Sequence, residues 1–155
     1  MEYEDPVEEL SEAECRRLLG TVPVGRVVYT EHALPAVLPV AFEVAQDGRL
    51  VLALRADSST ARALDGTVAA FQADVLDPET RSGWSVLVHG HAEVVRDHLA
   101  QDGLFEAGLR PWVGGPRPVY VALTPELVGG RRLRAVGVAA PAVSAAPARR
   151  PPADT

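Results

Sequence analysis

Residues 81–92 run Arg81-Ser82-Gly83-Trp84-Ser85-Val86-Leu87-Val88-His89-Gly90-His91-Ala92, and this stretch decides the fold class. Its bulky apolar side chains Trp84, Val86 and Val88 recur at every second position. That period is typical of a β-strand with one buried face. We expect the strand to run from Trp84 to Arg96 and to be the longest in the chain.

Similar alternating segments lie on both sides of this stretch. Further strands are expected at residues 24–30, 35–44, 49–55, 67–76 and 117–124, with a short last strand at 131–133. Asp47-Gly48 is a strong hairpin turn. Short helices are expected at 12–19, at 58–66 and, weakly, at 97–108, the first of them opened by a capping box of Ser11 and Glu14. Many short strands with few helices predict a mainly β barrel or sandwich.

The 155 residues predict one folded domain between two irregular ends. Residues 1–10 are acidic and are expected to be flexible. Residues 11–134 are expected to form the domain. Residues 135–155 are rich in Ala, Pro and Arg without periodicity, so we expect a disordered tail.

Composition excludes several classes of protein. A net charge of −6 and a pI near 5.2 argue against a general nucleic-acid binder, which needs a basic surface. Cys15 is the single cysteine, so no intramolecular disulfide can form. No apolar run reaches the roughly 20 residues of a membrane span, and the acidic start is unlike a secretory signal. We therefore expect a cytoplasmic protein with no membrane partner.

Four segments of the chain together resemble one known family. They are Val24-Gly25-Arg26-Val27 with residues 35–40, Arg55 and Ser59 with residues 70–74, the stretch 81–92, and residues 127–133. Over residues 11–134 the chain resembles the actinobacterial branch of the pyridoxamine 5′-phosphate oxidase-like flavoproteins. The resemblance implies a split β-barrel of about six to seven strands and a homodimer. It also implies FMN, or in some branches a deazaflavin, at the dimer interface.

A flavin phosphate needs N–H donors at a helix start together with cationic or hydroxyl groups. Arg55 at a strand end and Ser58, Ser59 and Thr60 at a helix start supply that set. The same residues also fit a simpler interpretation, in which Ser58 or Ser59 caps the helix and Arg55 lies in solvent.

The phosphate segment departs from the family pattern Arg-Thr-x-Gly-Ser-Lys. This chain has Ala56, Ser58 and Thr60 where the family has Thr, Gly and Lys, and Asp57 adds a negative charge. Ala41 stands where the family often has Asn. These departures fall on positions that face the flavin in the family, so the fold prediction is unaffected while flavin binding is left open.

The resemblance also assigns residues to the flavin ring. Pro39 and Val40 match the strand that lies along the ring, where backbone N–H groups can donate to ring atoms. Trp84 and Ser85 match positions near the ring or the phosphate. Trp84 equally fits the core, in phase with Val86, whereas Ser85 lies on the opposite face and is the better ligand candidate.

No catalytic residue or metal site is assigned. His89 and His91 share one strand face, but zinc needs further ligands, so a place on the barrel exterior or a dimer face is expected for both. Cys15 falls within a helix among residues expected to face the core.

The sequence therefore predicts an FMN-binding flavoprotein, an oxidoreductase that acts on an unidentified small molecule. In such proteins the cofactor carries the hydride chemistry, so no catalytic acid or base need be visible. Two alternatives stay open: a deazaflavin-dependent reductase, and a split barrel that has lost flavin and serves as a ligand-binding or interaction module.

Overall fold

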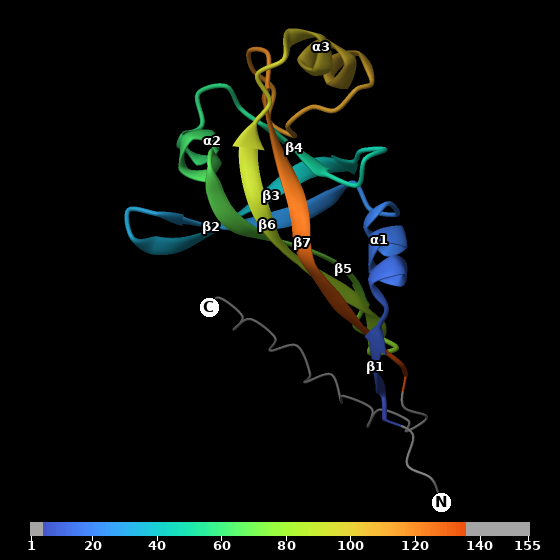
Figure 1. Ribbon diagram of the computed structural model, residues 1–155. Helices are drawn as coiled ribbons and strands as arrows, with labels where there is room; N and C mark the ends of the chain where they lie inside the picture. The colour runs from blue at the N-terminus through green and yellow to red at the C-terminus, as the bar shows by residue number, and fades with distance from the viewer. Residues whose placement is uncertain (1–4, 136–155) are drawn as a thin grey trace, which may run out of the picture.

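The structure is a computed structural model that describes residues 5–135. These residues form seven strands and three helices (Figure 1). The strands are β1 (Val7–Leu10), β2 (Val24–Glu31), β3 (Leu34–Val44), β4 (Leu50–Leu54), β5 (Thr67–Asp77), β6 (Ser82–Val94) and β7 (Val119–Leu133). The helices are α1 (Glu12–Leu19), α2 (Ser59–Leu64) and α3 (His98–Glu106), and none of these three is long and apolar enough to cross a membrane.

The strands pair antiparallel in the order β1-β7-β4-β3-β2-β5-β6, and β6 also pairs with β7. The pairing therefore runs in a ring through six strands, with β1 attached to the outside of β7. This arrangement confirms the predicted split β-barrel of about six to seven strands with short helices. Figure 1 shows α3 at one end of the ring and β1 at the other, where β6 and β7 extend beyond it.

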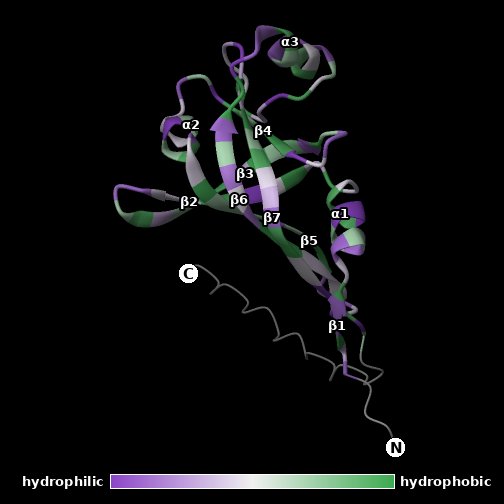
Figure 2. Cartoon of the chain, in the orientation of Figure 1, coloured by the Kyte–Doolittle hydropathy of each residue, from purple (hydrophilic) through white to green (hydrophobic). Residues whose placement is uncertain are grey.

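Helix α1 has the predicted bounds because its ends are specified locally. The Ser11 hydroxyl accepts a hydrogen bond from the Glu14 N–H at 3.2 Å, which satisfies one of the open donors at the helix start. Glu14 is also paired with Arg17 one turn later. The helix buries Cys15, Leu18 and Leu19, and Figure 2 shows hydrophilic residues over much of its remaining surface.

The core has two parts, one inside the ring of strands and one beneath α3. Alternating side chains of the strands fill the ring, among them Val27, Phe42, Leu52, Phe71, Trp84, Val86, Val88 and Val121. A second cluster lies on the outer face of β3, β4 and β7 and consists of Ala41, Val51, Ala53, Leu109 and Tyr120. In this region the sheet is therefore buried on both faces, and its outer face carries the small side chains Ala41 and Ala53 beside the large ring of Tyr120.

Gly25 and Gly90 are among the glycines required by close approach of neighbouring groups. A Cβ atom on Gly25 would lie 2.2 Å from Cζ of Phe71, and one on Gly90 would lie 1.8 Å from the carbonyl oxygen of Thr124. Both distances are far below van der Waals contact. Gly25 lets the Phe71 ring cross β2, and Gly90 lets β6 and β7 approach at an irregular point of their ladder.

Three sequence expectations differ from the structure. Residues 117–124 and 131–133 belong to one strand, β7, which replaces the stretch at 84–96 as the longest strand in the described chain. Residues 7–10 belong to the stretch 1–10 expected to be flexible, but they pair with the end of β7 as β1. The tail expected from residue 135 lies, beyond Ala135, outside the described residues.

Candidate functional site

The structure brings five of the eight predicted site residues together in one pocket. Pro39, Val40, Arg55, Ser58 and Thr60 line this hollow, which we call the Arg55 pocket. Of the other three, Ser59 is exposed beside it at the start of α2, Trp84 is buried in the core, and Ser85 lines a different groove.

The Arg55 pocket has a volume of about 270 Å³ and a predominantly apolar lining. Ala41 and Ala53 lie directly opposite each other in the β3–β4 ladder and leave space on its outer face. The remaining lining residues are Val24, Leu38, Leu54, Pro111, Trp112 and Val113. Within this lining, charged and hydroxyl side chains come only from the end of β4 and the start of α2, so the pocket has one strongly polar end.

At that polar end, the Arg55 side chain is held by a neighbouring carboxylate. Its Nε and Nη2 donate to the two oxygens of Asp57 at 3.1 and 2.9 Å. Both side chains are about half exposed. The negative charge that sequence analysis placed near the site therefore lies against the guanidinium, and a bound anion would compete with it.

The hydroxyl groups at the start of α2 have different partners. Ser58 is the N-cap: its Oγ accepts the Thr60 N–H at 3.1 Å. Thr60 is only 5% exposed, and its Oγ1 lies 3.0 Å from the Tyr29 hydroxyl. The capping interpretation of Ser58 is thus what the structure shows, and the exposed Ser59 has the side chain most open to solvent.

The predicted backbone donors along β3 are turned away from the pocket. Phe42 donates its N–H to the oxygen of Pro23 at 3.2 Å. Bonded pairs alternate along an antiparallel ladder, so Val40, which lies opposite Gly25, also directs its N–H toward β2. Pro39 has no N–H. This segment therefore gives the pocket apolar side chains, and neither Pro39 nor Val40 gives it an N–H donor.

Sequence analysis missed the wall formed by Pro111, Trp112 and Val113. These residues lie in the irregular segment between α3 and β7, which has no periodicity to follow. The available signal was an aromatic residue among Pro and Gly, and the structure leaves Trp112 80% exposed.

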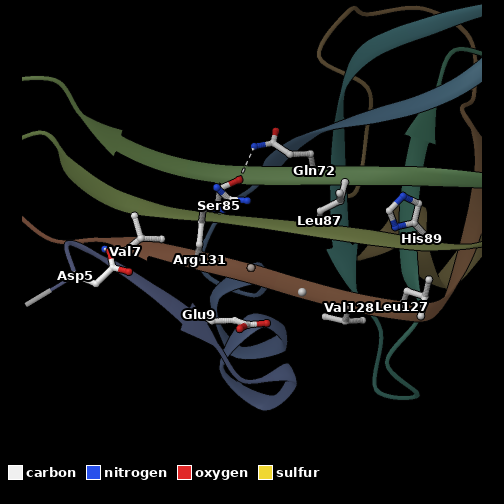
Figure 3. Close-up of a pocket in the computed structure, with 12 residues that line it drawn as sticks. Asp5, Val7, Glu9, Gln72, Ser85, Leu87, His89, Leu127, Val128 and Arg131 are labelled. Atoms are coloured by element: carbon white, nitrogen blue, oxygen red, sulfur yellow. Dashed lines mark hydrogen bonds between the residues drawn. The ribbon is translucent and has the colours of Figure 1, made fainter.

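A second hollow, the β6–β7 groove, is open and has a volume of about 1000 Å³ (Figure 3). Figure 3 shows Ser85, Leu87 and His89 along one side and Leu127 and Arg131 along the other. The groove is completed by Asp5, Val7, Glu9, Gln72, Val128, Gly129 and Gly130.

Ser85 belongs to a polar network on the outer face of the sheet. The Gln72 amide donates to its Oγ at 3.3 Å and to Asp74 at 2.7 Å. Asp74 in turn is paired with Arg26 at 3.1 Å. As predicted, Ser85 faces away from the core that contains Trp84.

His89 and His91 both lie on the barrel exterior. The His91 ring bonds to Glu126, the extra residue of a β-bulge where the ladder shifts between His89 and Gly90. This hydrogen bond lowers the pKa of the Glu126 carboxyl below its ordinary value. Between residues 5 and 135, no three metal-ligating side chains gather at one point.

The Arg55 pocket can hold a planar apolar group with an anionic end. Small side chains leave a hollow for the planar part, and Arg55, Ser58 and Ser59 can donate to the anion. The lining contains no pair of carboxylates, histidine or cysteine that could act as an acid, base or nucleophile. Chemistry in this pocket would therefore come from the bound group.

The chain is similar to one family model and to a protein of Mycobacterium tuberculosis. The family model for pyridoxamine 5′-phosphate oxidase matches residues 11–132. The uncharacterized protein Rv0080 of Mycobacterium tuberculosis is 42% identical over 132 residues, which cover 82% of this chain and 86% of that protein.

Solved structures agree with the match. An FAD binding protein from Mycobacterium smegmatis is 29% identical, with a TM-score of 0.63 over 83% of this chain and 99% of the other. A Corynebacterium glutamicum protein described as a candidate pyridoxamine 5′-phosphate oxidase is 28% identical. Its TM-score is 0.70 over 86% of this chain and 98% of that chain.

Proposed function

Because the chain belongs to the pyridoxamine 5′-phosphate oxidase family, we propose that it binds FMN in the Arg55 pocket and acts as an oxidoreductase on a small molecule. The observation that carries the proposal is the pocket itself, which joins an apolar hollow to the Arg55 guanidinium and the Ser58 hydroxyl, with the exposed Ser59 beside it. The FAD-binding relative from M. smegmatis supports a flavin as the class of ligand.

The residues present fit the two ends of a flavin. The volume of about 270 Å³ lies near the lower limit of the roughly 300–1,000 Å³ typical of ligand pockets. This volume can hold the flavin ring if the phosphate-bearing chain of FMN extends out of the pocket. Ala41, Ala53 and Pro39 would contact the ring, while Arg55, Ser58 and Ser59 would hold the phosphate.

In this proposal the protein binds, orients and shields, and the bound FMN supplies hydride and electron transfer. Arg55 binds the phosphate of FMN at the mouth of the Arg55 pocket. The position of the phosphate then fixes how far the flavin ring enters the pocket. The apolar lining keeps water from the ring.

We also propose a homodimer through the outer face of the barrel. Val37, Val28, Ala70, His89 and Leu127 lie opposite one another across five neighbouring strands. Val37 is 62% and Leu127 69% exposed. This row is mostly apolar, with His89 as its one polar member, and an exposed row of this kind is typical of a surface that a partner covers. A second copy would also bring Ser85 and the β6–β7 groove to the flavin.

One observation favours a second candidate function. Arg55 is already neutralised by Asp57, and the lining of the pocket holds no further cation. A weakened anion site is what a split barrel that has lost flavin would show, and such a protein would bind another ligand or a partner. A deazaflavin in place of FMN is the other alternative.

Titration with different flavins distinguishes these functions. We expect the purified protein to bind FMN added to it, seen as quenching of FMN fluorescence, and Arg55→Gln to weaken that binding. Arg49→Gln is the matched control, since Arg49 is held by Asp47 in the same way. Binding of a deazaflavin but not FMN would assign the other cofactor. Absence of binding for FMN, FAD and deazaflavin alike would favour the flavin-free module.

A further inference from the structure

The segment from Arg110 to Pro118, here called the Trp112 loop, is closed at its base by a single aromatic ring. The guanidinium carbon of Arg110 lies 4.2 Å from the centre of the Phe105 ring, and that of Arg117 lies 5.3 Å from it. Both are within the range of cation–π attraction. Arg117 also pairs with Asp102 of α3. Both ends of the loop are thus fastened to one helix.

The start of the loop is fixed to the floor of the Arg55 pocket. Leu109 is buried in the same cluster as Ala41 and Ala53. Its carbonyl oxygen accepts the Tyr120 hydroxyl at 2.6 Å. Burial raises the pKa of the Tyr120 phenol, so this donor stays protonated at neutral pH. Trp112 follows three residues later, on a loop that is anchored before and after it.

Trp112 is nevertheless 80% exposed while lining an apolar pocket. Exposed apolar surface is unfavourable in water. A planar ring in the pocket would cover the indole and gain an aromatic stacking contact. The loop therefore holds an aromatic side chain where a ligand ring can remove it from water.

We propose that Trp112 forms an aromatic wall that stacks on the planar ring of the ligand, and that Phe105 is the residue that positions this wall. The inference rests on the proposed function, since it requires a planar ring in the Arg55 pocket. It assigns affinity for the ring to Trp112 and affinity for the phosphate to Arg55. The two ends of the ligand are then recognised by separate elements of the chain.

The test uses two probes, FMN and lumichrome, which has the ring without the phosphate tail. We expect Trp112→Ala to weaken both about 3- to 10-fold and Trp112→Phe to restore most of the loss. Leu99→Ala is the matched control, because Leu99 is 81% exposed on α3 and lies outside the pocket lining. Arg55→Gln should weaken FMN alone.

Phe105 is tested by a double-mutant cycle. Phe105→Ala should weaken both probes, and Phe105→Tyr should keep the affinity because the ring is retained. In the Trp112→Ala background, Phe105→Ala should cost little more, since the wall it positions is gone. A purely structural role for Phe105 would instead lower affinity equally in both backgrounds.

A second measurement follows Trp112 directly. Trp84 and Trp112 are the two tryptophans of the chain, so Trp84→Phe leaves Trp112 as the single reporter. Bound lumichrome should protect its fluorescence from acrylamide quenching.

If Trp112→Ala binds both probes like the unmodified protein while Arg55→Gln weakens FMN, the inference is wrong and the proposed function stands. If the unmodified protein binds neither probe, both are wrong.

Discussion

Asp57 and a ligand phosphate would compete for the same guanidinium at the mouth of the Arg55 pocket. The fork of Arg55 is occupied by both carboxylate oxygens of Asp57, in a pair that solvent reaches from both sides. Exposed pairs of this kind contribute about 0–1 kcal/mol. The pair is therefore weak enough for an anion to displace, yet strong enough to reduce the affinity for that anion.

Asp57→Asn should tighten FMN binding by about 2- to 10-fold, because it removes a competitor and a repelling charge. The gain should shrink as ionic strength rises. Riboflavin, which lacks the phosphate, should show no gain. Asp47→Asn is the control, since it frees Arg49 far from the pocket lining. An equal gain for riboflavin and FMN would place the phosphate elsewhere.

Residue patterns predicted part of this site and missed the rest for physical reasons. Arg55 and Ser58 follow a strand and open a helix, so local sequence places them together. The orientation of Thr60 in α2 depends on its contact with Tyr29. Tyr29 lies in β2, far away in the sequence, and reaches Thr60 only when the chain folds. Trp112 lies in a loop whose position is set by Phe105 and by the second cluster beneath α3.

At the scale of elements, local rules predicted α1 and the β3–β4 hairpin, and long-range pairing explains what they missed. Pro125 interrupts the β7 pattern, but it lies at the irregular point opposite Gly90, where a proline is tolerated in a strand. The acidic strand β1 pairs with residues 130–133 at the end of β7, which lie far along the chain.

Gly90→Ala should lower the free energy of unfolding by about 1–3 kcal/mol or more, because its Cβ would overlap the Thr124 carbonyl. Gly129→Ala is a matched control on the neighbouring strand, where nothing lies within 4 Å of an added Cβ. Urea denaturation measures both. Equal stability of the two variants would mean that the ladder at Gly90 is wider than described.

Asp65 ties the end of α2 to the end of β6. Its carboxylate accepts the Val94 N–H at 2.9 Å and pairs with Arg96. The Arg96 hydrogen bond, followed by the Val94 N–H, lowers the pKa of Asp65 below its ordinary 3.8. A folded-state pKa below the unfolded one stabilises the fold above about pH 4, and this contribution is lost as pH falls through the folded-state value.

Asp65→Asn should therefore lower the melting temperature at neutral pH and have a progressively smaller effect as the pH drops below about 4. Asparagine can still accept the Val94 N–H, so the variant isolates the charge. Glu106→Gln removes an exposed carboxylate from α3 as a control. A difference in melting temperature that persists unchanged at about pH 3 would contradict the role of the ionised form.

At the scale of the whole molecule, the proposed dimer through the outer face of the barrel can be tested directly. We expect a homodimer in sedimentation equilibrium at micromolar concentration. Leu127→Asp places a charge in the apolar row and should shift the mass toward one chain. Leu99 of α3 is also highly exposed, so Leu99→Asp serves as the control and should leave the mass unchanged. A mass of one chain for the unmodified protein at every concentration would contradict the dimer.

Strand β7 pairs with β1, β4 and β6, so the last strand of the barrel closes the ring. During synthesis, β4 and β6 each keep an open edge until residues 119–133 have been made. From Val94 to Leu133 is 133 − 94 = 39 residues, which take about 2–8 s at roughly 5–20 residues per second. Until β7 is available, the strands that pair with it have edges that can pair with other chains, so growth temperature and chaperone supply should affect the yield of folded protein.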